Sequence, residues 1–144
     1  MNATATDLAR SPHRIWRSVG AILAGALVGI VLELSTDSVL RAAGIYPPLG
    51  QPLSDSLLMM ATVYRTIYGV FGAYFAARLA PSHPMRHALI LGAIGLAMSI
   101  LGTVMTWNKG PAFGPHWYPI ALDVLAVPQS WLGGKLREWQ ISRK

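Results

Sequence analysis

Three charged residues lie inside otherwise apolar stretches of this sequence, namely Glu33, Arg65 and Asp123. A charge near the centre of a lipid bilayer costs roughly 3 kcal/mol or more unless it faces protein or water. One arginine with two carboxylates can hold an ion, a proton or a small polar solute, so these residues are candidates for a functional site. The structural alternative is a buried pair of Arg65 with Asp123 that fixes the register of two helices.

Hydrogen-bonding side chains accompany the arginine along the same stretch. Thr62, Tyr64 and Tyr68 lie within one helical turn of Arg65 and are expected to donate hydrogen bonds to the same site. Two carboxylates for one guanidinium leave one carboxylate spare, which suits the binding or transfer of a proton.

Four apolar stretches must position these residues, and they cover approximately residues 15–38, 57–77, 88–106 and 117–134. Each has about the 20 residues that a helix needs to cross the hydrocarbon layer. The 144-residue chain is only 12% charged, too little to cover a water-facing surface of this size. The alternation typical of a membrane β-barrel does not occur. The sequence therefore predicts an all-α fold: one membrane domain over residues 1–144, built as a bundle of four transmembrane helices.

The basic residues are distributed unequally between the two sides of such a bundle. Of the 12 lysines and arginines, nine lie in the N-terminal tail, the second connection and the C-terminal tail, which share one side. The other side has Arg41 and Lys109 only, and the twelfth residue, Arg65, lies within a span. Because positive residues favour the cytoplasmic side, both termini are expected in the cytoplasm of a bacterium, with the spans in its inner membrane.

Depth places the three charged residues in the outer half of the membrane. At ~1.5 Å per residue, Arg65 is expected about 12 Å and Asp123 about 9 Å below the outer edge, with Glu33 between about 2 and 8 Å. Asp37 and Asp55 are expected just above them. The cluster would then be open to the periplasm.

Small residues recur three or four positions apart in each stretch, which is typical of contacts between membrane helices. The residues predicted to pack are Gly25, Gly29, Gly69, Gly72, Gly92, Gly95, Ser99 and Gly102. Glu33, Arg65 and Asp123 fall on the same stripes as the small residues of their own stretches, so all three are expected to point into the bundle. Pro128 interrupts the fourth stretch and predicts either an ordinary kink or a hinge in a broken helix.

Other function classes are disfavoured by what the sequence lacks. It has no cysteine, which excludes thiolate metal sites and cysteine nucleophiles. Its four histidines are scattered, so neither a metal site nor a cofactor is expected. The sequence contains no nucleophile elbow, phosphate-binding loop or dinucleotide fingerprint, so an enzyme is not expected. Membrane topology explains the net charge of +6 better than nucleic acid binding does.

In length and expected number of spans, the chain is similar to small multidrug-resistance exporters and to fluoride channels. Their motifs do not carry over, because the exporters have their key carboxylate early in the first helix, whereas Glu33 is late. The unequal charge distribution also differs from the balanced or paired topology of the channels. No residue role is transferred from either family.

The predicted function is therefore the binding or transport of an ion, a proton or a small polar solute. The expected partners are the lipid bilayer and either further copies of the chain or a larger membrane protein. The alternative is a non-catalytic accessory or scaffold subunit. In that case the charges would be structural, and a small-residue face such as Gly25 and Gly29 would bind the partner.

Overall fold

The structure, a computed structural model, describes the backbone of residues 5–144 and the side chains from residue 12 onward. Its elements are α1 (Ala5–Ala42), α2 (Asp55–Leu79), α3 (Pro84–Thr106), the short 3-10 helix η1 (Pro111–Phe113) and α4 (Trp117–Ser142). Each predicted apolar stretch lies within one of the four α-helices, and residues 5–144 contain no strand. The prediction of an all-α fold is confirmed.

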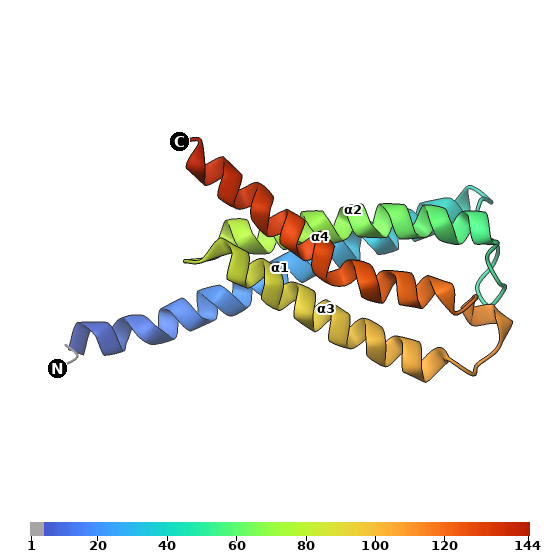
Figure 1. Cartoon of the computed structure of the whole chain (residues 1–144), viewed down its shortest axis with the longest axis horizontal. Helices are drawn as coiled ribbons and strands as arrows, with labels where there is room; N and C mark the ends of the chain where they lie inside the picture. The colour runs from blue at the N-terminus through green and yellow to red at the C-terminus, as the bar shows by residue number, and fades with distance from the viewer. Residues whose placement is uncertain (1–4) are drawn as a thin grey trace.

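The helices run alternately in opposite directions (Figure 1). Both chain ends and the short turn between α2 and α3 lie at one end of the bundle, and the longer connections, residues 43–54 and 107–116, lie at the other. Pro84 opens α3, where its missing N–H is not needed for a helical hydrogen bond. The molecule therefore has a terminal end and a loop end.

Two of the described helices are long and apolar enough to cross a membrane: residues Pro12–Ala42 of α1, and α3. α2 contains Arg65 and three tyrosines, and α4 carries Asp123 and a charged C-terminal half. These polar residues lower the hydropathy of α2 and α4. Membrane crossing by all four helices therefore stays a prediction.

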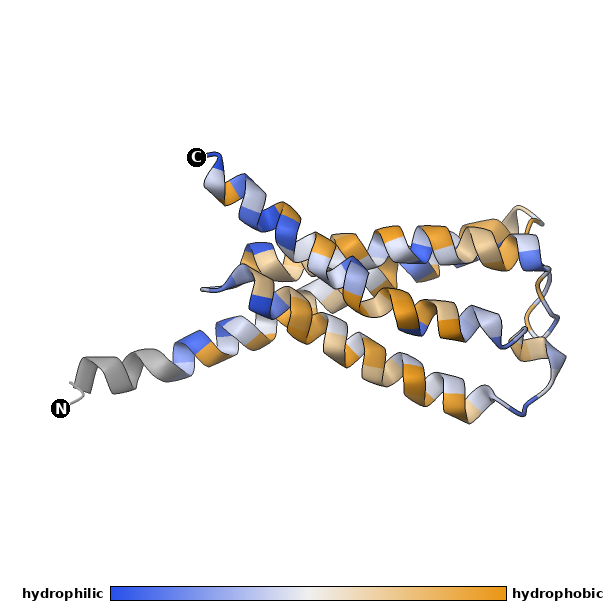
Figure 2. Ribbon diagram, in the orientation of Figure 1, coloured by the Kyte–Doolittle hydropathy of each residue, from blue (hydrophilic) through white to orange (hydrophobic). Residues whose placement is uncertain are grey.

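Small residues build the interior of the bundle. The most buried apolar side chains are nearly all alanines, and Ala73, Ala77 and Ala88 form a connected cluster. Large apolar side chains are exposed instead, for example Val63 on α2 and Met98 on α3. Hydrophobic residues occur along the length of all four helices of the bundle (Figure 2). This distribution is typical of helices that pack in lipid, where small residues allow close backbone approach.

Several predicted packing residues lie where two helices nearly touch. A Cβ on Gly25 would lie 2.5 Å from the Gly72 carbonyl oxygen, so α1 and α2 meet backbone to backbone. A Cβ on Gly92 would meet Ser130 of α4 at 2.5 Å. Gly29 and Gly69 also face neighbouring helices. The face of Gly25 and Gly29 is therefore occupied by α2, and it is not the free partner surface that the scaffold alternative assumed.

The packing stripe of α3 does not continue to its C-terminal end. A Cβ on Gly95 or Gly102 would meet no atom within 4 Å, and Ser99 between them is half-exposed. α3 diverges from the other helices toward this end (Figure 1). The expected packing of Gly95 and Gly102 does not occur within one chain. The spacing of small residues identifies a face of the helix, but it does not show along how much of its length a neighbouring helix contacts that face.

α4 is continuous from Trp117 to Ser142 although Pro128 lies inside it. The proline cannot donate a hydrogen bond to the carbonyl of Val124, and α4 changes direction part-way along its length (Figure 1). Of the two interpretations of Pro128, the structure therefore has the kink, and α4 is not broken into two helices.

Candidate functional site

Arg65 joins α2 to α1 through two carboxylates. Its Nη2 lies 2.7 Å from Oδ2 of Asp37, and its Nη1 lies 3.5 Å from Oε2 of Glu33. Glu33 and Asp37 are four residues apart, so they share one face of α1. The expected contact between Arg65 and Glu33 is present, and Asp37, expected only above the cluster, is the closer partner.

Asp123 does not join this cluster. Its Oδ2 accepts a hydrogen bond from Oγ1 of Thr103 on α3 at 3.2 Å, and within the described chain its buried Oδ1 has no partner. The expected pair of Arg65 with Asp123 is thus replaced by pairs between α2 and α1. The stripes placed both residues inside the bundle at similar depth, but they could not say which neighbouring helix each would face.

Two tyrosines of α2 extend the contact with α1. The Tyr64 hydroxyl donates a hydrogen bond to Oδ1 of Asp37, and the Tyr68 hydroxyl lies 2.8 Å from Oγ1 of Thr36. Both bonds involve residues predicted for the site. Thr62, in contrast, donates to the carbonyl of Leu58 in its own helix, 2.9 Å away, and makes no contact with the acids.

The connection after α1 folds back onto the cluster. Gly44 has a φ of +72°, which allows the chain to reverse at the end of the helix. The backbone N–H groups of Ile45 and Tyr46 both donate to the carbonyl of Leu40, at 2.9 and 3.1 Å. This turn buries Tyr46, whose hydroxyl lies 3.0 Å from that of Tyr64.

The connection before α4 lies at the same end of the bundle (Figure 1). Oδ1 of Asp55, at the start of α2, accepts a hydrogen bond from Nε1 of Trp117 at 3.2 Å. Within the connection, the rings of Trp107 and His116 stack with their centres 4.0 Å apart. The starts of α2 and α4 are therefore joined to each other beside this connection.

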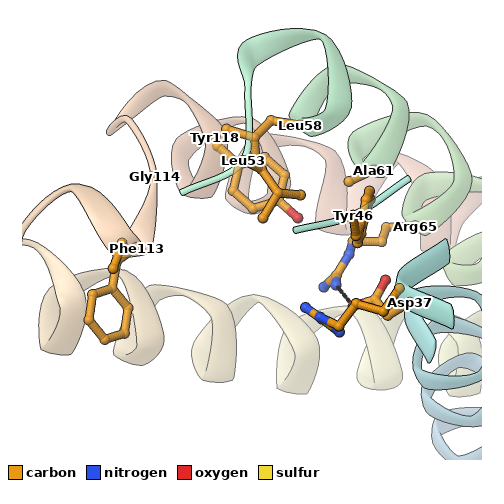
Figure 3. Close-up of a pocket in the computed structure, with 11 residues that line it drawn as sticks. Asp37, Tyr46, Leu53, Leu58, Ala61, Arg65, Phe113, Gly114 and Tyr118 are labelled. Atoms are coloured by element: carbon orange, nitrogen blue, oxygen red, sulfur yellow. Dashed lines mark hydrogen bonds and ion pairs between the residues drawn. The ribbon is translucent and has the colours of Figure 1, made fainter. Parts of the chain in front are cut away.

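Between these connections and the cluster lies a cavity of about 200 Å³ (Figure 3). Its polar lining consists of Asp37, Arg41, Tyr46, Arg65 and Tyr118. Its apolar lining consists of Leu53, Leu58, Ala61, Ala112, Phe113 and Gly114. Sequence reasoning chose only Arg65 among these residues. Half of the others come from connections, whose path the hydropathy pattern does not define, and the other half lie in the α-helices.

The charges that line the cavity are unequal. Both oxygens of Asp37 are engaged, one by Tyr64 and one by Arg65. Arg41 has no carboxylate partner among the described residues, and its buried Nε has no hydrogen-bond partner there. The Arg41 guanidinium lies 5.9 Å from the centre of the Tyr46 ring, a cation–π distance. Two guanidinium groups therefore face one fully engaged carboxylate.

No set of three His, Asp or Glu side chains that could hold a metal ion occurs in the part of the chain that the structure describes. Compared with known protein families, with curated proteins and with solved structures, the chain gives no match. The functional argument therefore depends on the cavity and on the residues that line it.

Proposed function

We propose that this chain is an integral protein of the bacterial inner membrane with four spans and both termini in the cytoplasm, and that its loop-end cavity binds a small polar solute or an ion from the outer side. The observation that carries the proposal is the cavity itself. It combines Arg41, which has no carboxylate partner among the described residues, with an ion-paired Arg65 at the end of the bundle away from the basic termini.

The exposed apolar side chains of α2 and α4 support the proposal that all four helices cross the membrane. The residues that make α2 polar, Arg65 and Tyr68 among them, contact α1, whereas Val63 and Phe71 on its other face are 60% and 49% exposed. On α4, Val124 is 66% exposed beside the inward-facing Asp123. Large apolar exposure of this kind is suited to lipid rather than to water.

The proposed topology predicts opposite labelling of two single-cysteine variants in spheroplasts. Leu49→Cys lies in the connection of the loop end, and Ser82→Cys lies in the turn between α2 and α3. A membrane-impermeant maleimide is expected to label Leu49→Cys in intact spheroplasts and Ser82→Cys only after permeabilisation. The chain has no native cysteine, so the background is clean. Equal labelling of both variants before permeabilisation would contradict the topology.

A solute site predicts that the cavity is accessible to water. Ala61 and Ala73 are alanines of α2 with 2% and 0% exposure, but only Ala61 lines the cavity. In detergent, the uncharged reagent hydroxyethyl methanethiosulfonate is expected to modify Ala61→Cys at least about tenfold faster than Ala73→Cys. The reason is that the thiolate is the reacting form, so both water and the reagent must reach the thiol. Equally slow reaction of the two thiols would mean a dry cluster, and the solute site would be abandoned.

The dry outcome would favour the second candidate function, an accessory or scaffold subunit. One observation supports this alternative: the face of α3 that carries Gly95 and Gly102 has no partner within the described chain. In membranes such a face allows close approach of another helix. A partner helix or a second copy of this chain would then cover it, and the pairs of Arg65 would serve only to hold α1 on α2.

A further inference from the structure

The cavity can bind an anion more readily than a cation. A cation would need a carboxylate with a free oxygen in the lining, but both oxygens of Asp37 are already bonded, and Glu33, whose Oε2 pairs with Arg65, does not line the cavity. The free charge of the lining is the guanidinium of Arg41. We propose that the cavity binds a small organic monoanion, a carboxylate with an apolar body about the size of one ring. The inference rests on the proposed solute site and names its ligand class.

Arg41 is suited to hold a carboxylate. A guanidinium offers parallel N–H groups that match the two oxygens of a carboxylate, and such charge-assisted pairs are stronger than neutral hydrogen bonds. Its position over the Tyr46 ring holds the group at the wall of the cavity. The side chain of Tyr118 lines the same cavity and offers a hydroxyl donor from the start of α4 (Figure 3).

The remainder of the lining fits an apolar body. Leu53, Leu58 and Phe113 line the cavity from two connections and the start of α2. The volume of about 200 Å³ exceeds the roughly 150 Å³ that is enough to hold benzene in a protein interior. It is smaller than the pockets that take drug-sized ligands, which start at about 300 Å³. A single ring with one carboxylate is therefore the appropriate size.

Charge balance favours one negative charge over two. Asp37 lies within the lining, so a second charge on the ligand would approach this carboxylate at short range and be repelled. Lys109, whose Nζ lies 5.9 Å from the centre of the Phe113 ring, adds a positive charge near the mouth. It would draw anions toward the cavity without pairing inside it.

The test uses protection of Ala61→Cys from hydroxyethyl methanethiosulfonate by three compounds of similar shape: benzoate, benzamide and benzylamine. At millimolar concentration, benzoate is expected to slow the modification at least about fivefold, and the neutral and cationic compounds less than about twofold. Titration calorimetry of the unsubstituted protein with the same compounds checks the ranking without the introduced thiol.

Variants of Arg41 test whether its guanidinium binds the benzoate. Arg41→Gln is expected to weaken benzoate binding about tenfold and Arg41→Lys less, because lysine keeps the charge but not the planar pair of donors. Arg86→Gln removes a charge from the terminal end and is the control, with unchanged binding expected. Should Arg41→Gln fail to fold, Tyr118→Phe replaces it, with binding expected to weaken about threefold through loss of one donor.

The outcomes separate the inference from the proposed function. An unreactive Ala61→Cys removes the solute site and the inference together. A reactive thiol that benzoate protects no better than benzamide, or that benzylamine protects best, overturns the monoanion while the solute site stands. Benzoate binding that is unchanged in Arg41→Gln, or in Tyr118→Phe where that variant replaces it, overturns the inference as well.

Discussion

Replacing Gly25 with alanine is expected to lower the melting temperature of the protein in detergent by on the order of 10 °C. The added Cβ would lie 2.5 Å from the Gly72 carbonyl oxygen and 2.7 Å from the Ala76 Cβ. Neither atom belongs to a flexible side chain, so the clash can be relieved only by moving α1 away from α2. That movement would also lengthen the contacts of Arg65 with Asp37.

A matched control lies in the same helix. A Cβ on Gly20 would meet no atom within 4 Å, so Gly20→Ala is expected to leave the melting temperature unchanged or raise it slightly, since alanine favours the helix. Thermal unfolding followed by circular dichroism measures both variants. Equal melting temperatures for Gly25→Ala and Gly20→Ala would contradict the close contact of α1 with α2.

The packing of α1 on α2 shows what small-residue spacing can predict. The stripe with Gly25 and the stripe with Gly72 were both evident in the sequence, and the structure brings these two residues together. The stripe of α3 was the most regular, yet Gly95 and Gly102 face open space. Spacing depends on one helix alone, whereas contact depends on the direction of its neighbour, and α3 diverges from its neighbours.

The candidate site was predictable only in part, for a similar reason. Glu33 and Arg65 stood out because charges are costly in apolar stretches, and the structure pairs them. Asp37 lies one turn farther along α1, where the apolar stretch ends, so nothing marked it as an inward residue. Tyr46 enters the cavity through the turn after α1, and periodicity does not describe the path of such a turn. Arg41 lies in the last turn of α1, beyond the apolar stretch.

The second large expected effect concerns the contribution of the charge cluster to stability. Arg65→Leu is expected to lower the free energy of unfolding by ~3 kcal/mol, because it leaves Glu33 and Asp37 without their cation. The side chains of Arg65 and Asp37 are 27% and 16% exposed, so water compensates only partly. A triple variant that adds Glu33→Gln and Asp37→Asn to Arg65→Leu is expected to recover much of the loss, since no unpaired charge then remains in the cluster.

Double-mutant cycles identify the partner of Arg65. The cycle of Arg65→Leu with Asp37→Asn is expected to give a coupling free energy of ~2 kcal/mol, whereas the cycle with Asp123→Asn should be additive within ~0.5 kcal/mol. Asp123→Asn alone should cost little, because the amide oxygen can still accept from Thr103. Unfolding in mixed micelles with increasing sodium dodecyl sulfate measures each variant.

Stronger coupling of Arg65 with Asp123 than with Asp37 would restore the pair between α2 and α4 and contradict the placement of the site. The expected result instead assigns Arg65 to the attachment of α1 to α2. Arg41 is then the cation of the cavity that is free to meet a ligand. The triple variant, with neutral residues at positions 33, 37 and 65, would keep Arg41 and Tyr118, so any benzoate binding that it retains does not depend on Arg65.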